Sequence, residues 1–184
     1  MLGIKLICVG KLKENFFIDA ANEYIKRLSG YCKLETAELP EYRINIKSAV
    51  RSAVSLKSET RSLEPDSAAA AHNNAHTAIA LDKEREAIMS KIPGGAKSIA
   101  LCIEGQEADS VWLSEMLSGS AVDGVSKLCF IIGGSNGLHE SVKKAADLKL
   151  SLSRMTLPHN LARIVLLEQL YRAFSILHGA KYHK

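Results

Sequence analysis

The chain has 184 residues and a mass of 20.0 kDa, and 47% of its residues are hydrophobic. This composition predicts a single globular domain and excludes a fibrous or disordered chain, while no apolar run is long enough for a transmembrane helix and no signal peptide is expected. The net charge of +4 is uneven, since residues 143–184 hold eight Lys or Arg against two Asp or Glu. That segment either attracts phosphate or nucleic acid, or is a solvated helix face followed by a tail.

The first part of the chain predicts alternating strands and helices. Apolar runs without clear alternation predict strands at residues 3–9 and 33–39. Apolar residues at helical spacing predict helices at residues 14–29, 44–61 and 78–92. Residues 62–77 are simple in composition and poor in large apolar residues, so we expect an exposed insertion or mobile loop there.

The same alternation continues to the end of the chain. We expect strands at residues 98–103, 128–132 and 148–152. Helices are expected at residues 109–117, 138–146 and 156–177, the last entered through a proline. The pattern predicts one α/β domain over residues 1–184, with a mostly parallel sheet covered by helices.

The cysteine and histidine patterns do not favour a metal site. The sequence has four cysteines and no CxxC motif: Cys8, Cys32, Cys102 and Cys129. Most of them lie in predicted strands, which favours free thiols in a reducing cytosol. His72 and His76 lie four residues apart, but no third ligand is near them in the sequence. We expect no bound metal.

Residues 130–137, FIIGGSNG, are the strongest local motif. A predicted strand leads into a glycine-rich turn and then a helix, and in open α/β sheets ligands bind at the carboxyl ends of strands. The motif is neither a Walker loop nor a GxGxxG dinucleotide pattern. It indicates either a ligand-binding turn or a simple tight turn.

A second candidate region covers residues 151–174. A loop with several free backbone groups precedes a helix that is apolar on nearly every side, as expected for a subunit interface or for the central helix of a monomer. Three charged residues, Arg163, Glu168 and Arg172, interrupt it and form either an ion-pair network or a site. The tail at 178–184 is either a frayed end or a group of side chains that grip phosphate and move protons.

Three segments, IIGGSNGLHESV (131–142), LSLSRMTLPHNLARIVLLEQLYRAF (150–174) and the terminal KYHK (181–184), closely resemble the ribosomal RNA large-subunit methyltransferase H family. The first strand and helix, IKLICVGKLKENFFIDAANEYIKRL (4–28), are also similar to that family. The resemblance covers nearly the whole chain, although the region around residues 61–80 is longer than is usual there.

The resemblance implies a SPOUT methyltransferase with a deep trefoil knot near the C-terminus. Members of this family are cytoplasmic homodimers without metal or membrane association. They transfer a methyl group from S-adenosylmethionine to N3 of a pseudouridine in helix 69 of 23S rRNA, and they act on the assembled 70S ribosome. The alternative is a non-catalytic ribosome- or RNA-binding protein of the same fold; a nucleotide-binding enzyme that uses GGSNG for phosphates is the weaker third possibility.

The family's functional positions can be placed on this sequence. The cofactor pocket would use Leu101, Gly133, Leu152, Ser153, Arg154, Met155, Thr156 and Leu157. The resemblance and the chemistry favour Tyr182 and His183, with Arg154, for catalysis, while His159 also remains a candidate base. Substrate contacts would come from His159, Arg163, Arg172, Lys181 and Lys184. The sequence does not choose the general base.

Overall fold

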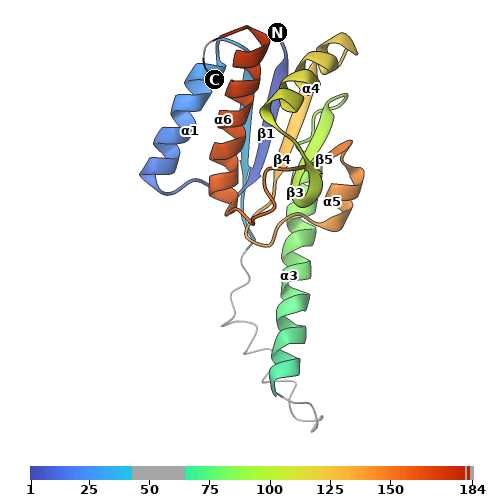
Figure 1. Ribbon diagram of the computed structural model, residues 1–184. Helices are drawn as coiled ribbons and strands as arrows, with labels where there is room; N and C mark the ends of the chain where they lie inside the picture. Colours follow the sequence, from blue (N-terminus) through green and yellow to red (C-terminus); the bar gives the residue numbers. More distant parts are fainter. Residues whose placement is uncertain (43–64, 181, 183–184) are drawn as a thin grey trace.

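The computed structural model describes residues 1–42, 65–180 and 182, with backbone alone at 65–75 and 121. Within these residues a five-stranded sheet has the order β2-β1-β4-β3-β5, and every pairing between its strands is parallel. Its strands are β1 (Gly3–Val9), β2 (Lys33–Leu39), β3 (Lys97–Glu107), β4 (Lys127–Ile132) and β5 (Leu148–Ser151). The carboxyl ends of all these strands therefore meet at one edge of the sheet (Figure 1).

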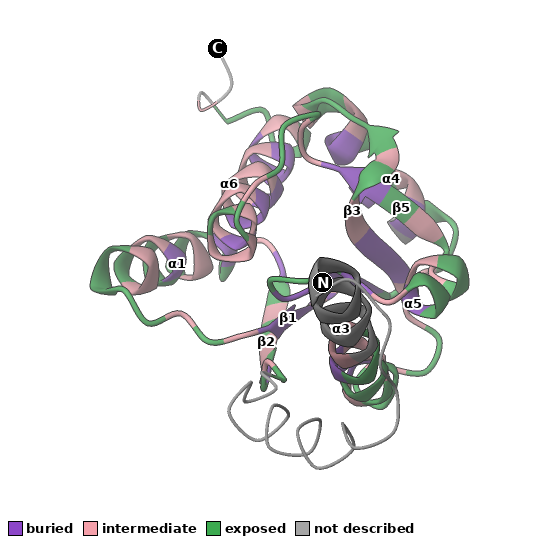
Figure 2. Ribbon diagram, turned by 90° about the horizontal axis from the view of Figure 1, so that it is seen from below, coloured by how far each residue is buried: buried purple, intermediate pink, exposed green. Residues whose placement is uncertain are grey.

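Helices cover both faces of the sheet. One face packs against α1 (Asn15–Leu28), α4 (Ser110–Val122) and α6 (His159–Leu177), and the other against α3 (Pro65–Met89) and α5 (Glu140–Ala145). Figure 2 shows the two helical layers with the sheet between them. The prediction of an α/β domain with a parallel sheet covered by helices is confirmed.

The core explains why the strands lack alternation. In β4 every residue from Leu128 to Ile132 is buried, because Phe130 faces the α1, α4 and α6 layer while Cys129 and Ile131 face α3 and α5. The thiols of Cys8, Cys32 and Cys129 are buried and free, as expected, and that of Cys102 is half-buried and also free. Burial raises the pKa of the Cys8 thiol to about 12, so this thiol stays protonated and serves as an apolar group.

The expectation of a loop at residues 62–77 is wrong from residue 65 onward. The backbone there is helical and continuous with the helix predicted at 78–92, so that α3 runs from Pro65 to Met89. Four consecutive alanines at 68–71 have the highest helix propensity, and proline suits the first helical position. The first part of α3 extends beyond the carboxyl edge of the sheet (Figure 1). The helix predicted at 44–61 lies outside the described residues.

Helix α6 is buried along one face only. Leu166, Leu167 and Leu170 are fully buried against the sheet, whereas Leu161 and Leu177 are 37% and 39% exposed. The other apolar residues that do not face the sheet are half-buried, so a single chain does not cover this helix on all sides. No helix in the described ranges is both long enough and apolar enough to cross a bilayer.

Candidate functional site

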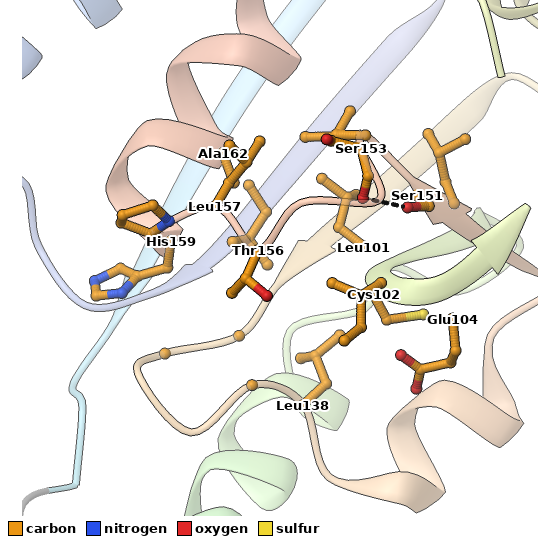
Figure 3. Close-up of a pocket in the computed structure, with 18 of the residues that line it drawn as sticks. Leu101, Cys102, Glu104, Leu138, Ser151, Ser153, Thr156, Leu157, His159 and Ala162 are labelled. Atoms are coloured by element: carbon orange, nitrogen blue, oxygen red, sulfur yellow. Dashed lines mark hydrogen bonds between the residues drawn. The ribbon is translucent and has the colours of Figure 1, made fainter. Parts of the chain in front are cut away.

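A cavity of about 640 Å³ opens at the carboxyl edge of the sheet, where β4 and β5 end beside the middle of β3. This volume is in the range of small-molecule and cofactor sites. Three chain segments form it together: the middle of β3, the glycine turn after β4, and the segment that joins β5 to α6 (Figure 3). Its lining comprises residues 101–104, 132–138, 150–153 and 155–159, together with Lys143 and Ala162.

The glycine turn is closed by its own backbone. The N–H of Gly137 donates to the carbonyl oxygen of Gly134 at 3.0 Å, and Gly137 has a φ of 76°, a conformation that favours glycine. A Cβ on Gly133 would overlap with the carbonyl group of Gly137 and lie 2.9 Å from the backbone nitrogen of Leu138. Gly133 is therefore required for closure of the turn.

The segment after β5 is held by short-range hydrogen bonds. The buried hydroxyl of Ser151 donates to the carbonyl oxygen of Ser153 at 3.0 Å, and the Ser153 hydroxyl accepts from the N–H of Met155 at 3.0 Å. These bonds fix a bend just before Thr156 and Leu157, which both line the cavity (Figure 3). Seven of the eight predicted cofactor positions line the cavity: Leu101, Gly133, Leu152, Ser153, Met155, Thr156 and Leu157.

The eighth position, Arg154, lies outside the cavity lining. Its side chain is 87% exposed, and its Nε donates to Glu107 Oε1 at 2.6 Å. This hydrogen bond raises the pKa of the Arg154 guanidinium above its usual value. A charged and exposed guanidinium beside the mouth of a pocket suits a phosphate better than a bound ring system.

Of the predicted substrate residues that the structure describes, His159 is the one that lines the cavity. It occupies the first turn of α6, directly after Pro158, and both residues line the pocket. The His159 ring packs against the end of β1, since a Cβ on Gly10 would come within 3.1 Å of His159 Nε2. Gly10 has a φ of 93°, so glycine is needed there both for the backbone and for the histidine ring.

Arg163 belongs to the interior of the fold. Its side chain is 7% exposed, and its Nη1 donates to Glu38 Oε1 at 2.6 Å, joining α6 to β2. The buried Nε of Arg163 has no hydrogen-bond partner among the described residues. This environment favours a structural ion pair over a direct substrate contact.

We expect Arg163→Ala to lower the free energy of unfolding by about 2–3 kcal/mol, because it removes a buried charged hydrogen bond and leaves Glu38 unpaired. Chemical denaturation with urea measures this change. Arg154→Ala is the matched control, since it removes an exposed guanidinium that also pairs with a glutamate. Equal midpoints for the two variants would contradict the structural role of Arg163.

Tyr182 and Arg172 meet on the exposed side of α6, away from the cavity. Glu168 Oε1 accepts from Arg172 Nη2 at 2.7 Å and from the Tyr182 hydroxyl at 3.2 Å. The Tyr182 ring lies edge-on to Tyr171 at 4.8 Å and beneath the Arg172 guanidinium at 4.8 Å. Burial and hydrogen bonding with Tyr24 raise the pKa of Tyr182 to about 12. Lys181, His183 and Lys184 lie outside the described residues.

Three polar residues at the cavity were not predicted from the sequence. Cys102 and Glu104 continue β3 past Leu101, and Lys143 comes from α5. The Lys143 ammonium forms ion pairs with Glu104 and Glu140, and its hydrogen bond lowers the pKa of Glu104. For Cys102 and Glu104 the available signal was their place at the carboxyl end of the strand predicted at residues 98–103; Lys143, on α5, gave no such signal. Among the described residues no cluster of His, Cys, Asp or Glu could hold a metal ion.

Comparison with known proteins assigns the class. A family model described as "Predicted SPOUT methyltransferase" matches residues 2–183. The fold, with its cavity at the carboxyl edge of a parallel sheet, is thus that of a SPOUT-class methyltransferase domain. A likeness to the tRNA (m1G37) methyltransferase of Aquifex aeolicus has a TM-score of 0.49 at 16% identity, and covers 100% of this chain and 73% of that chain.

Curated relatives narrow the class to a family. The chain is 43% identical over 181 residues to the "Ribosomal RNA large subunit methyltransferase H" of Streptococcus pyogenes serotype M5 (strain Manfredo), covering 98% of this chain and 99% of that protein. It is 42% identical, with the same coverage, to the protein of that name from serotype M12 (strain MGAS2096). The chain belongs to the ribosomal RNA large subunit methyltransferase H family.

Proposed function

We propose that this protein methylates N3 of a pseudouridine in helix 69 of 23S rRNA, with S-adenosylmethionine as methyl donor and the assembled 70S ribosome as substrate. The observation that carries the proposal is the cavity, where the glycine turn and the segment after β5 meet in a member of this rRNA methyltransferase family. We further propose a cytoplasmic homodimer whose chain forms the family's deep trefoil knot.

The cavity fits this cofactor in size and in chemistry. Leu101, Leu138 and Leu152 offer apolar surface for a flat ring, and the Thr156–Leu157 backbone offers hydrogen-bonding groups around it. Gly133 and Gly134 allow a close approach to the main chain. When bound there, the cofactor would supply a sulfonium methyl group for transfer to N3. The role of the chain is therefore mainly to position the acceptor base in line.

Transfer to N3 also requires removal of its proton. Among the described residues, His159 is the histidine that lines the cavity, so we assign it the first place among the candidate bases. The phenol of Tyr182, with a pKa of about 12, is protonated at neutral pH and can donate a hydrogen bond to a developing anion. Arg154, exposed at the rim, is suited to a backbone phosphate of the rRNA.

The position of Tyr182 makes the homodimer part of this proposal. Tyr182 contacts Glu168, which lies nine residues beyond His159 along α6, or about 13 Å at 1.5 Å per residue. The described part of the tail therefore does not line the cavity of its own chain. In a dimer through the half-buried face of α6, one tail can serve the other subunit's cavity, which is consistent with a role for Tyr182 and His183 in catalysis.

The test is transfer of labelled methyl groups to 70S ribosomes, free 50S subunits and naked 23S rRNA from cells that lack the modification. We expect label only on the helix 69 pseudouridine and only with 70S ribosomes, located by mass spectrometry. A rise in melting temperature with S-adenosylhomocysteine checks the pocket independently. Cofactor binding without transfer to any of these RNAs would mean that the protein methylates another acceptor. Absence of cofactor binding would favour the alternative, a ribosome-binding protein without catalysis.

A further inference from the structure

The glycine turn of the cavity also contacts a segment outside the cavity, directly after β2. The Ser135 N–H donates to Glu41 Oε1 at 3.1 Å, across a sequence separation of 94 residues. Gly134 is packed between the same glutamate and the end of β1, since a Cβ there would lie 3.4 Å from Glu41 Cγ and 3.0 Å from Val9 Cγ1. Glu41 therefore supports the turn from its outer side.

The position of Glu41 is in turn set by helix α3. The N–H of the next residue, Tyr42, donates to Glu84 Oε1 at 3.0 Å. The Lys83 ammonium lies over the Tyr42 ring, 5.4 Å from its centre. Helix α3 thus holds Tyr42 by both its backbone and its ring. Because Glu41 directly precedes Tyr42, these contacts also fix the backbone position from which the Glu41 side chain extends.

Stability alone does not account for a carboxylate at position 84. Glu84 is only 2% exposed, and its Oε2 has no hydrogen-bond partner among the described residues. Burial raises the pKa of Glu84, and the nearby Glu41 carboxylate adds to this effect. The hydrogen bond from the Tyr42 N–H lowers the pKa but does not outweigh burial. A buried carboxylate with one hydrogen bond is costly, and an apolar residue would pack there at lower cost. What the carboxylate adds is a fixed acceptor for Tyr42.

We propose that Glu84 and Glu41 form a clasp, Glu84–Tyr42–Glu41–Ser135, that holds the glycine turn in the shape required by the cofactor. Glu84 is then a positioning residue for a cavity it does not line, and α3 contributes to cofactor affinity at a distance. The inference rests on the proposed function only in that the ligand of the cavity is S-adenosylmethionine.

The test compares Glu84→Ala and Glu41→Ala by hydrogen–deuterium exchange of residues 131–138 without ligand, and by calorimetry with S-adenosylhomocysteine. Each variant is expected to exchange about tenfold faster at the turn and to bind about tenfold more weakly, as for loss of a hydrogen bond to a charged group. The double variant should be no weaker than either single variant, because the two residues act in series.

Two matched variants separate positioning from general stability. Glu84→Gln retains an oxygen acceptor for Tyr42 and should stay within about twofold of the wild type in both measurements. Glu86→Ala removes an exposed carboxylate of the same helix and should change neither. The proposal is overturned if Glu41→Ala shows the wild-type rate of exchange at the turn, and this result decides even if Glu84→Ala fails to fold. It is also overturned if Glu84→Gln is as impaired as Glu84→Ala. If the wild type does not bind the ligand, the proposed function fails while the exchange data still decide the clasp.

Discussion

Gly133→Ala is expected to weaken S-adenosylhomocysteine binding by at least about 100-fold, because a small displacement of the groups that contact a ligand has a large effect. The added Cβ would overlap with the Gly137 carbonyl group, and neither backbone segment can move aside without opening the turn. The turn forms one wall of the cavity, so a shift there moves several ligand contacts together. Isothermal titration calorimetry measures the loss directly.

Gly119→Ala is the control for this substitution. Gly119 lies within α4, and a Cβ there would meet no atom within 4 Å beyond its chain neighbours and the backbone of its own helix. Alanine at this position should raise the free energy of unfolding by up to about 1 kcal/mol, because glycine is a poor helix former. Binding by Gly119→Ala should equal that of the wild type. Wild-type affinity in Gly133→Ala would show that the turn is not part of the ligand site.

Removal of Tyr182 to Lys184 is expected to reduce methyl transfer by at least about 100-fold while cofactor affinity stays within about twofold. Tyr182 contacts Glu168, Tyr171 and Arg172, all remote from the cavity, so its loss leaves the pocket intact. Its proposed role begins only when the rRNA is bound. Single-turnover transfer to 70S ribosomes, together with calorimetry, separates these two effects.

Tyr182→Phe refines the same prediction. It keeps the ring on Tyr171 and removes only the hydroxyl, which donates to Glu168 at 3.2 Å. Loss of transfer in Tyr182→Phe would assign the effect to the phenol, whereas loss only on truncation would assign it to the rest of the tail. Full activity of the truncated protein would remove the tail from the catalytic site.

Much of the fold was predictable because its signals are local. The all-apolar run that forms β4 requires cover on both faces, and the helical spacing of residues in α1 requires one buried face. The failure at residues 62–77 has a physical reason. Low complexity and few large apolar residues indicate weak packing, but they do not exclude helix when the residues are alanines.

The candidate site was predictable only in part. The glycine turn and the segment after β5 have strong local motifs, and the fold brings both to one cavity. Arg163 could not be assigned, because its partner Glu38 is 125 residues away in the sequence and on another element. Glu84 gave no signal either, since a glutamate on a charged helix is ordinarily solvent-exposed. Such roles depend on pairings that only the folded chain creates.

The strand order also has a consequence for the synthesis of this protein. β1 pairs on one side with β2, where Gly3 lies opposite Lys33, a residue close to it in the sequence. On its other side β1 pairs with β4, where Gly3 lies opposite Lys127, which is synthesised much later. At about 5–20 residues per second, translation leaves the backbone N–H and C=O groups on that edge of β1 without their partner strand for at least about 6 seconds. The nascent chain is thus expected to need protection from aggregation, by a chaperone or by the ribosome surface, until β4 emerges and pairs with β1.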